Sequence, residues 1–234
     1  MYVSLMPIAH LAWATFFRWR GMTWLPRLAY AYRAPMLFAG EGVRRGLFSG
    51  TVGGADEQVL AADYDGRGDR NADGTDMIYM AGHGRLRSGE FELLLHSDEW
   101  RPASSGLDAG GPKIAIFDAC DLVDLQDPRW SDPWRAQIRP NLRMLLGFNS
   151  LATVKKGAAL RGEEFASRLS RGEPVAGAWI GAVKQHDAHG RERPVAIGFG
   201  SSVADADRLL ENATFADVLA MPPLESDVVV RERV

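Results

Sequence analysis

The stretch PKIAIFDAC, residues 112–120, decides the fold class, because Pro112 is followed by an almost unbroken run of apolar residues. A short run of this kind is typical of a strand that is buried on both faces of a sheet. Three other stretches have the same character: DMIYMAG (76–82), LRMLLGFNS (142–150) and PVAIGFGSS (194–202). We expect a strand in each of them.

Helices are expected around these strands. The stretch GAALRGEEFASRLSRG (157–172) repeats apolar residues at helical spacing and ends at Gly172. EPVAGAWIGAVKQH (173–186) carries Pro174 in its first turn, and ADADRLLENATFADVL (204–219) predicts one more helix. Strands that alternate with helices indicate an α/β fold with a mostly parallel central sheet that is covered on both faces.

The remaining segments give weaker patterns. A first strand is expected at Val3–Ile8, with a helix from Leu11 to Trp19, and FELLLHS (91–97) predicts a short hairpin strand beside the main sheet. Residues 47–76 are expected to run from a glycine-rich turn through a short helical piece into an acidic loop. Residues 222–234 are expected to form a polar tail.

Length and composition favour a single α/β domain over residues 1–234, with its core at about 50–205 and an unassigned, aromatic and arginine-rich element at 1–50. The chain is 46% apolar and 24% charged, and its net charge of −3 includes no basic block, which argues against a nucleic-acid partner. The apolar run Leu5–Phe17 is too short to span a membrane and lacks the features of a secretion signal. With one cysteine, no intrachain disulfide is possible, and we expect a cytoplasmic protein.

Two chemically reactive side chains follow two of the predicted strands. His83, between two glycines, lies just past the end of the strand predicted by DMIYMAG, and Cys120 lies just past the end of the strand predicted within PKIAIFDAC. Parallel sheets place their sites beyond the carboxyl ends of the strands. If the two strands are neighbours, both side chains therefore emerge at the same edge of the sheet.

These residue types supply the parts that an acyl-transfer site needs. A thiolate attacks a carbonyl, and an imidazole can accept the thiol proton and later protonate the leaving amine. Backbone N–H groups must stabilise the oxyanion, and glycine lets the backbone come close. The sequence offers His83 and Cys120 for the first two roles, and the amides of Gly84 and Cys120 for the third.

A strand that ends in His-Gly, followed by a strand that ends in Asp-Ala-Cys, resembles the caspase-fold cysteine peptidases, which include caspases, metacaspases, gingipains and legumains. The resemblance covers about residues 76–200 and points to a divergent, bacterial-type member. It implies a three-layer α/β/α sandwich. It also implies that His83 is the general acid and base, that Cys120 is the nucleophile, and that the amides of Gly84 and Cys120 form the oxyanion hole.

The sequence departs from the caspase pattern in two ways. The Gln-Ala-Cys-x-Gly motif is absent, and His83 lies 37 positions before Cys120, fewer than the roughly 50 given for caspases. Resemblance to metacaspases implies instead that Asp118, two positions before the cysteine, helps to bind Arg or Lys at the cleaved residue. A buried carboxylate pairs well with a guanidinium.

Acidic residues recur at every third position after the strand: Asp118, Asp121, Asp124 and Asp127. Nearby negative charge raises the pKa of a thiol, and a protonated His83 offsets this effect only if it is closer than the carboxylates. Either the acidic side chains point into solvent, or the resting thiol is weakly activated and needs substrate or a cation.

Two further features are candidates for binding. Trp130 and Trp134 follow the nucleophile and either wall a substrate cleft or cap the core. Asp69, Asn71 and Asp73 copy the start of a calcium-binding loop, although the twelfth position is Met80 instead of Glu. The proposed chemistry requires no cofactor, and calcium remains one option for this acidic loop.

The sequence therefore predicts a cysteine endopeptidase that acts on a peptide or protein, cleaving after Arg or Lys through a thioester. Two alternatives stay open, and so does the oligomeric state. The same thioester serves a peptide ligase or cyclase, in which an amine replaces water. A catalytically inactive caspase-like module would instead bind a partner through the first 50 residues.

Overall fold

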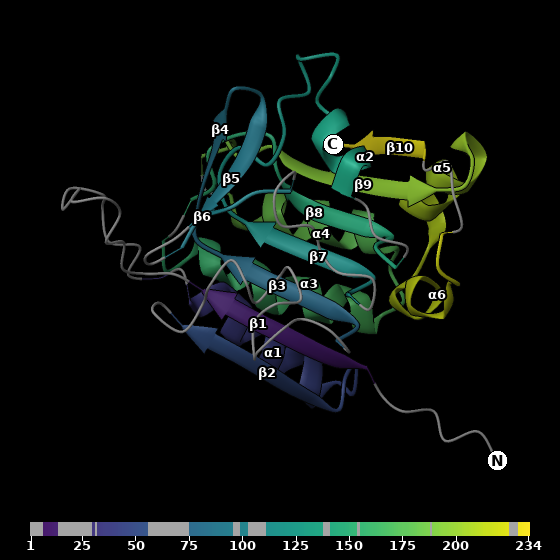
Figure 1. The fold of residues 1–234 in the computed structure, drawn as a ribbon. Coiled ribbons are helices and arrows are strands. Elements are labelled where there is room, and N and C mark those ends of the chain that lie inside the picture. The colour runs from purple at the N-terminus through teal and green to yellow at the C-terminus, as the bar shows by residue number, and fades with distance from the viewer. Residues whose placement is uncertain are drawn as a thin grey trace.

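The structure is a computed structural model, and the central sheet is its main element (Figure 1). It describes residues 7–13, 30, 32–55, 75–95, 99–102, 111–137, 141–153, 155–187, 189–224 and 229–234. The strands of the sheet are β1 (Ile8–Trp13), β2 (Gly50–Ala55), β3 (Met77–Ala81), β7 (Ile114–Asp118), β8 (Met144–Phe148), β9 (Pro194–Gly200) and β10 (Val229–Arg233).

The order of these seven strands is β10-β9-β8-β7-β3-β1-β2. The neighbours from β2 to β8 pair in parallel, whereas β9 is antiparallel to β8 and β10 is antiparallel to β9. The expected α/β fold with a mostly parallel central sheet is thereby confirmed.

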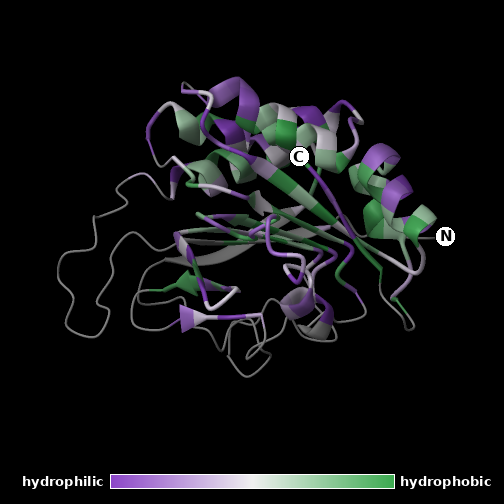
Figure 2. Ribbon diagram, turned by 90° about the horizontal axis from the view of Figure 1, so that it is seen from above, coloured by the Kyte–Doolittle hydropathy of each residue, from purple (hydrophilic) through white to green (hydrophobic). Residues whose placement is uncertain are grey.

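Helices lie along one side of the sheet, and the other side carries a small second sheet together with one short helix (Figure 2). The helices are α1 (Arg33–Arg44), α2 (Asp132–Gln137), the 3-10 turn η3 (Ala158–Leu160), α3 (Arg161–Ser170), α4 (Val175–His186), α5 (Val203–Asn212) and α6 (Phe215–Ala220). The small antiparallel sheet consists of β4 (His83–Arg87), β5 (Glu90–Leu94) and β6 (Glu99–Trp100). The three layers are thus helices, sheet, and a mixed layer that contains α2.

Alternation along the strands divides the core into two halves. In β3, Met77 and Tyr79 face the helices, whereas Ile78 and Met80 face the small sheet. A strand directs successive side chains to opposite faces of the sheet, so apolar side chains on both faces need a layer that covers them. All five residues of β3 and of β7 are buried, which explains why these strands read as continuous apolar runs.

The N-terminal predictions were wrong in detail. The first strand, β1, runs from Ile8 to Trp13, where the sequence predicted the start of a helix. The glycine-rich segment that was expected to be a turn contains the edge strand β2. Part of the unassigned first 50 residues forms α1, whose buried Phe38 stacks on Phe165 of α3 at 5.5 Å between ring centroids. Among the described residues, no helix is long and apolar enough to cross a membrane.

The C-terminal predictions also needed correction. The single helix expected over 204–219 is two helices, because Thr214 begins a new one with a capping box in which its side chain and that of Asp217 bond each other's backbone amides. The polar tail contains β10, which pairs with β9. Its outward residues are exposed, so the segment lacks the apolar pattern of a buried strand.

Candidate active site

Strand register brings the two predicted catalytic residues to the same edge of the sheet. β3 and β7 are neighbours and pair in parallel, with Ala81 opposite Asp118. His83 and Cys120 each lie two residues beyond this pair. The Gly82 amide donates a hydrogen bond to the Asp118 carbonyl at 3.3 Å. This bond extends the contact between the two segments past the end of β3.

Gly84 lies directly against the backbone of Cys120. A Cβ atom at position 84 would sit 2.1 Å from the Cys120 carbonyl oxygen and 2.8 Å from the Phe91 ring. Only a residue without a side chain permits this approach. The glycine that follows His83 is therefore explained by close packing of the His-Gly segment on Cys120.

Gly84→Ala is expected to lower the free energy of unfolding by about 2–3 kcal/mol, because the added methyl group overlaps a backbone atom that cannot move aside cheaply. Urea denaturation would measure this. Gly157→Ala is a suitable control, since a Cβ there meets nothing within 4 Å. A stability loss at Gly84 no larger than at Gly157 would contradict the packing described here.

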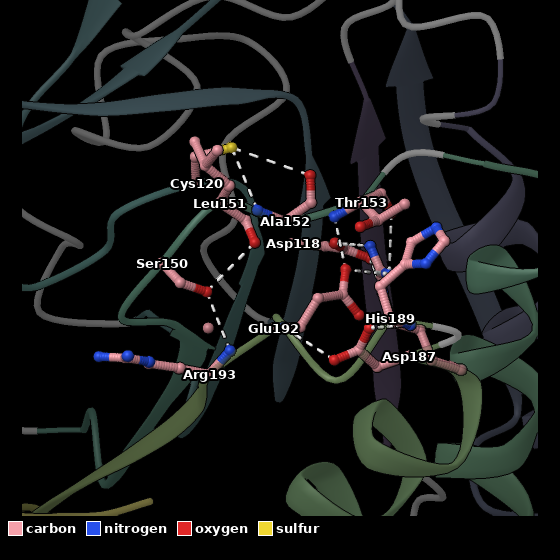
Figure 3. A network of polar contacts seen from close by, with 12 residues as sticks. Asp118, Cys120, Ser150, Leu151, Ala152, Thr153, Asp187, His189, Glu192 and Arg193 are labelled. Carbon is pink, nitrogen blue, oxygen red and sulfur yellow. Dashed lines mark hydrogen bonds and ion pairs between the residues drawn. The ribbon is translucent and has the colours of Figure 1, made fainter.

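Hydrogen bonds join the loop that carries Cys120 to the loop that follows β8 (Figure 3). The residue after Cys120, Asp121, has a left-handed backbone with φ of 53°, and its amide donates to the Ser150 carbonyl at 2.9 Å. The Ala152 amide donates to Cys120 Sγ at 3.2 Å, and Sγ lies 3.9 Å from the Ala152 carbonyl oxygen. The loop that follows β8 thus contributes a backbone donor aimed at the sulfur.

The surroundings of Cys120 favour the neutral thiol. Burial raises the thiol pKa above its ordinary value of 9.0, the hydrogen bond from Ala152 lowers it, and the charges of Asp121 and Asp118 raise it again. A raised pKa of Cys120 agrees with a weakly activated resting thiol, and the expected need for substrate or a cation stays a prediction. Asp124 is exposed, and Asp127 accepts hydrogen bonds from Arg129, so these two acids do not contribute to the shift.

Because the pKa of Cys120 is raised, its alkylation by iodoacetamide is expected to keep accelerating as the pH rises through 9.0. Below the pKa the rate follows the thiolate fraction, which rises about tenfold per pH unit. Mass spectrometry of the alkylated protein between pH 6 and 10.5 would measure the profile. A plateau reached by pH 7 would mean that a neighbouring cation, such as protonated His83, already holds a thiolate.

Asp118 is occupied by an internal arginine. Arg161 donates to both carboxylate oxygens of Asp118, through Nε at 3.0 Å and through Nη2, and the Tyr79 hydroxyl donates to the same carboxylate at 3.1 Å. Asp118 and Arg161 are each 2% exposed. The oxygens of Asp118 therefore already bind a guanidinium of the protein, and the expected role of Asp118 in binding Arg or Lys of a substrate stays a prediction.

Arg161 and Glu192 form a buried network that the sequence did not predict. Burial works against the charge of Arg161, but Asp118 and other neighbours raise its pKa above the ordinary value. Its Nη1 reaches Glu192 at 3.3 Å, and its guanidinium lies over the Phe148 ring at 5.2 Å. Burial also raises the pKa of Glu192, an effect that Arg161 counteracts.

The structure distinguishes the two alternatives for Trp134. Trp134 is 4% exposed and packs against Phe91, Phe117 and Trp100 with ring centroids 6.1–6.5 Å apart. It therefore caps the core beneath the small sheet, which was the second alternative. Trp130 is partly buried against the same cluster.

The possible calcium ligands Asp69, Asn71 and Asp73 lie outside the described residues. Within the part of the chain that the structure describes, no group of three or more metal-binding side chains gathers. The calcium prediction therefore stays a prediction.

The comparisons with known proteins give a family and a set of structural likenesses. The structure is similar to that of caspase-1 from Spodoptera frugiperda, with a TM-score of 0.47, 14% sequence identity, and coverage of 82% of this chain and 86% of that one. It is also similar to flavodoxin from Streptococcus pneumonia TIGR4, with a TM-score of 0.33, 15% identity, and coverage of 70% and 98%. No curated protein matches the sequence. A family model matches residues 53–218, well over half of the chain, and the chain therefore belongs to the family described as Domain of unknown function (DUF6345).

Proposed function

We propose that this protein is a cysteine peptidase in which His83 and Cys120 form the catalytic dyad. The observation that carries the proposal is the register of β3 and β7, which puts both residues two positions beyond the paired residues Ala81 and Asp118. The close approach of Gly84 to the Cys120 carbonyl supports it. A general base, a nucleophile and backbone amides then share one sheet edge.

The reaction follows from the roles of these groups. His83 accepts the thiol proton of Cys120 as Sγ attacks the carbonyl carbon of the scissile bond, and the amides of Gly84 and Cys120 stabilise the oxyanion. The C–N bond then breaks, His83 protonates the departing amine, and a thioester remains on Sγ. Water, deprotonated by His83, attacks the thioester, and the carboxylic acid leaves with return of the proton to the thiol.

We propose a preference for Arg or Lys at the cleaved residue only under one condition. Asp118 can bind a basic substrate side chain only if that side chain displaces Arg161 from it. A second region offers space without displacement: a pocket of about 160 Å³ is bounded by Thr153, Lys155 and His189, among others, and Thr153 directly follows the residue that contacts Sγ. We expect this pocket to receive a neighbouring residue of the substrate.

The proposal is tested by incubating the purified protein with a peptide mixture in which each of the twenty amino acids precedes the scissile bond. Mass spectrometry then detects the cleavage products. We expect cleavage products from wild type and none from Cys120→Ser, whose hydroxyl is a far weaker nucleophile without a stronger base. Cleavage by the serine variant at the wild-type rate would contradict the proposal. Products joined to an added amine in place of water would identify the ligase variant of the same chemistry.

A catalytically inactive binding module is the second candidate, and two observations favour it. The pKa of Cys120 is raised, so little thiolate forms at neutral pH, and Asp118 is sealed by Arg161. For such a module, the peptide mixture would yield no products, and removal of His83 would leave the reactivity of Cys120 unchanged.

A further inference from the structure

We propose that Glu192 and Arg161 are positioning residues for Cys120: they hold Thr153 by its amide and its carbonyl, and thereby direct the neighbouring Ala152 N–H at Sγ. The inference rests on the proposed function for its importance to catalysis. Figure 3 shows Ala152 beside the sulfur and the next residue, Thr153, beside Glu192.

Both polar groups of the Thr153 backbone are engaged. Its amide donates to Glu192 Oε1 at 2.5 Å, and its carbonyl accepts from Arg161 Nη1 at 3.0 Å. Arg161 Nη1 also lies 3.3 Å from Glu192 Oε1. The two side chains therefore contact each other as well as the Thr153 backbone. A residue of an irregular loop is thus held on both sides, which also restricts the peptide that it shares with Ala152.

The two side chains that hold Thr153 are themselves fixed. Arg161 is anchored by the two oxygens of Asp118, at the end of β7. The Glu192 amide donates to Asp187 Oδ2 at 2.8 Å, and Glu192 is 7% exposed as a residue, with 1% of its side chain exposed. Because these anchors belong to the strand of Cys120 and to the loop before β9, the position of Ala152 is set relative to the nucleophile.

The Ala152 amide matters to the thiolate more than to the thiol. A donated N–H stabilises negative charge, and hydrogen bonds to charged groups are stronger than those between neutral groups. The negative charge of Glu192 would act in the opposite direction, since nearby anions raise the pKa of a thiol. A positioning role and a charge role for Glu192 therefore predict opposite effects on Cys120, and they can be separated experimentally.

The experiment compares Glu192→Gln, which removes the charge but keeps an acceptor oxygen at the same reach, with Glu192→Asp, which keeps the charge but shortens the side chain. The readout is the pH profile of Cys120 alkylation by iodoacetamide in the full chain, with urea unfolding measured on each variant. Glu41→Gln and Glu41→Asp are matched controls, because Glu41 is also 7% exposed and paired with arginines, but on α1.

We expect Glu192→Asp to slow alkylation about tenfold at any pH below the pKa, which corresponds to an upward shift of one pH unit in the profile. Glu192→Gln and both Glu41 variants should match wild type. Faster alkylation in Glu192→Gln would show that Glu192 acts through its charge, and an unchanged profile in Glu192→Asp would show that its reach is irrelevant. Either result overturns the inference.

A second measurement applies if Glu192→Asp does not fold. In wild type, hydrogen exchange of the Thr153 amide should be slow although the residue lies in a loop, and rapid exchange would overturn the inference. Alkylation needs no peptide substrate, so the outcome is independent of peptidase activity. A shifted profile in a protein that cleaves nothing would uphold the positioning role and refute the proposed function.

Discussion

Replacement of Arg161 by alanine is expected to lower the free energy of unfolding by about 3–5 kcal/mol, the largest stability effect predicted for this chain. Arg161 neutralises Asp118, and both side chains are 2% exposed. Without the guanidinium, the Asp118 carboxylate would remain buried beside the Tyr79 hydroxyl with no cation, and Glu192 would lose its counterion as well. Urea or thermal unfolding monitored by circular dichroism would measure the change.

The matched control is Arg171→Ala. Arg171 also belongs to the region of α3 and also pairs with carboxylates, but its side chain is 47% exposed, and we expect a much smaller loss of stability than for Arg161→Ala. The triple variant Asp118→Leu, Arg161→Met and Glu192→Gln should recover much of the loss, because it leaves none of these three buried side chains with an unpaired charge. A cost below about 1 kcal/mol for Arg161→Ala would contradict the buried pair.

Replacement of His83 by alanine is expected to reduce kcat/KM for peptide cleavage by a factor of about 10²–10⁴, the usual contribution of general acid–base catalysis. The need for a base is pronounced here, because burial and the nearby acids raise the pKa of Cys120 and leave little thiolate at neutral pH. Initial rates on the best peptide from the mixture would measure the loss.

Added imidazole provides the control for His83→Ala. If the alanine variant lacks only a base, imidazole should restore part of the activity in proportion to its concentration, whereas a variant damaged in its fold should not respond. A His83→Ala enzyme with wild-type kcat/KM would remove His83 from the mechanism. It would leave Cys120 as an isolated thiol.

The buried strands could be predicted from the sequence because their environment is uniform. β3, β7, β8 and β9 are covered on both faces, so apart from Asp118 at the end of β7 their positions carry no charged side chain, and the flanking turns mark the ends. β1 lies inside a longer apolar run, where no polar residue marks its bounds. The edge strand β2 has three glycines in six residues, a composition that equally fits a turn.

Part of the candidate site could also be predicted from the sequence. His83 and Cys120 could be placed because each directly follows a strand that the apolar pattern reveals, and the strands proved to be neighbours. The partner of Asp118 could not, because Arg161 is 43 positions away on a helix whose pattern marks it as an ordinary polar position. Glu192 lies in a polar loop, and only the tertiary fold shows that its carboxylate points inward.

In the proposed mechanism, Cys120 is a nucleophile that accepts the acyl group and is activated by His83. The most direct test is to incubate wild type, His83→Ala and Cys120→Ala with peptide acyloxymethyl ketones carrying Arg, Asp or Ala at the reactive position, with and without calcium, and to measure adduct mass over time. Activation of Cys120 by His83 predicts a single adduct on Cys120 in wild type, at least about 100-fold slower labelling in His83→Ala, and none in Cys120→Ala. Labelling of Cys120 at the same slow rate with and without His83 would contradict it.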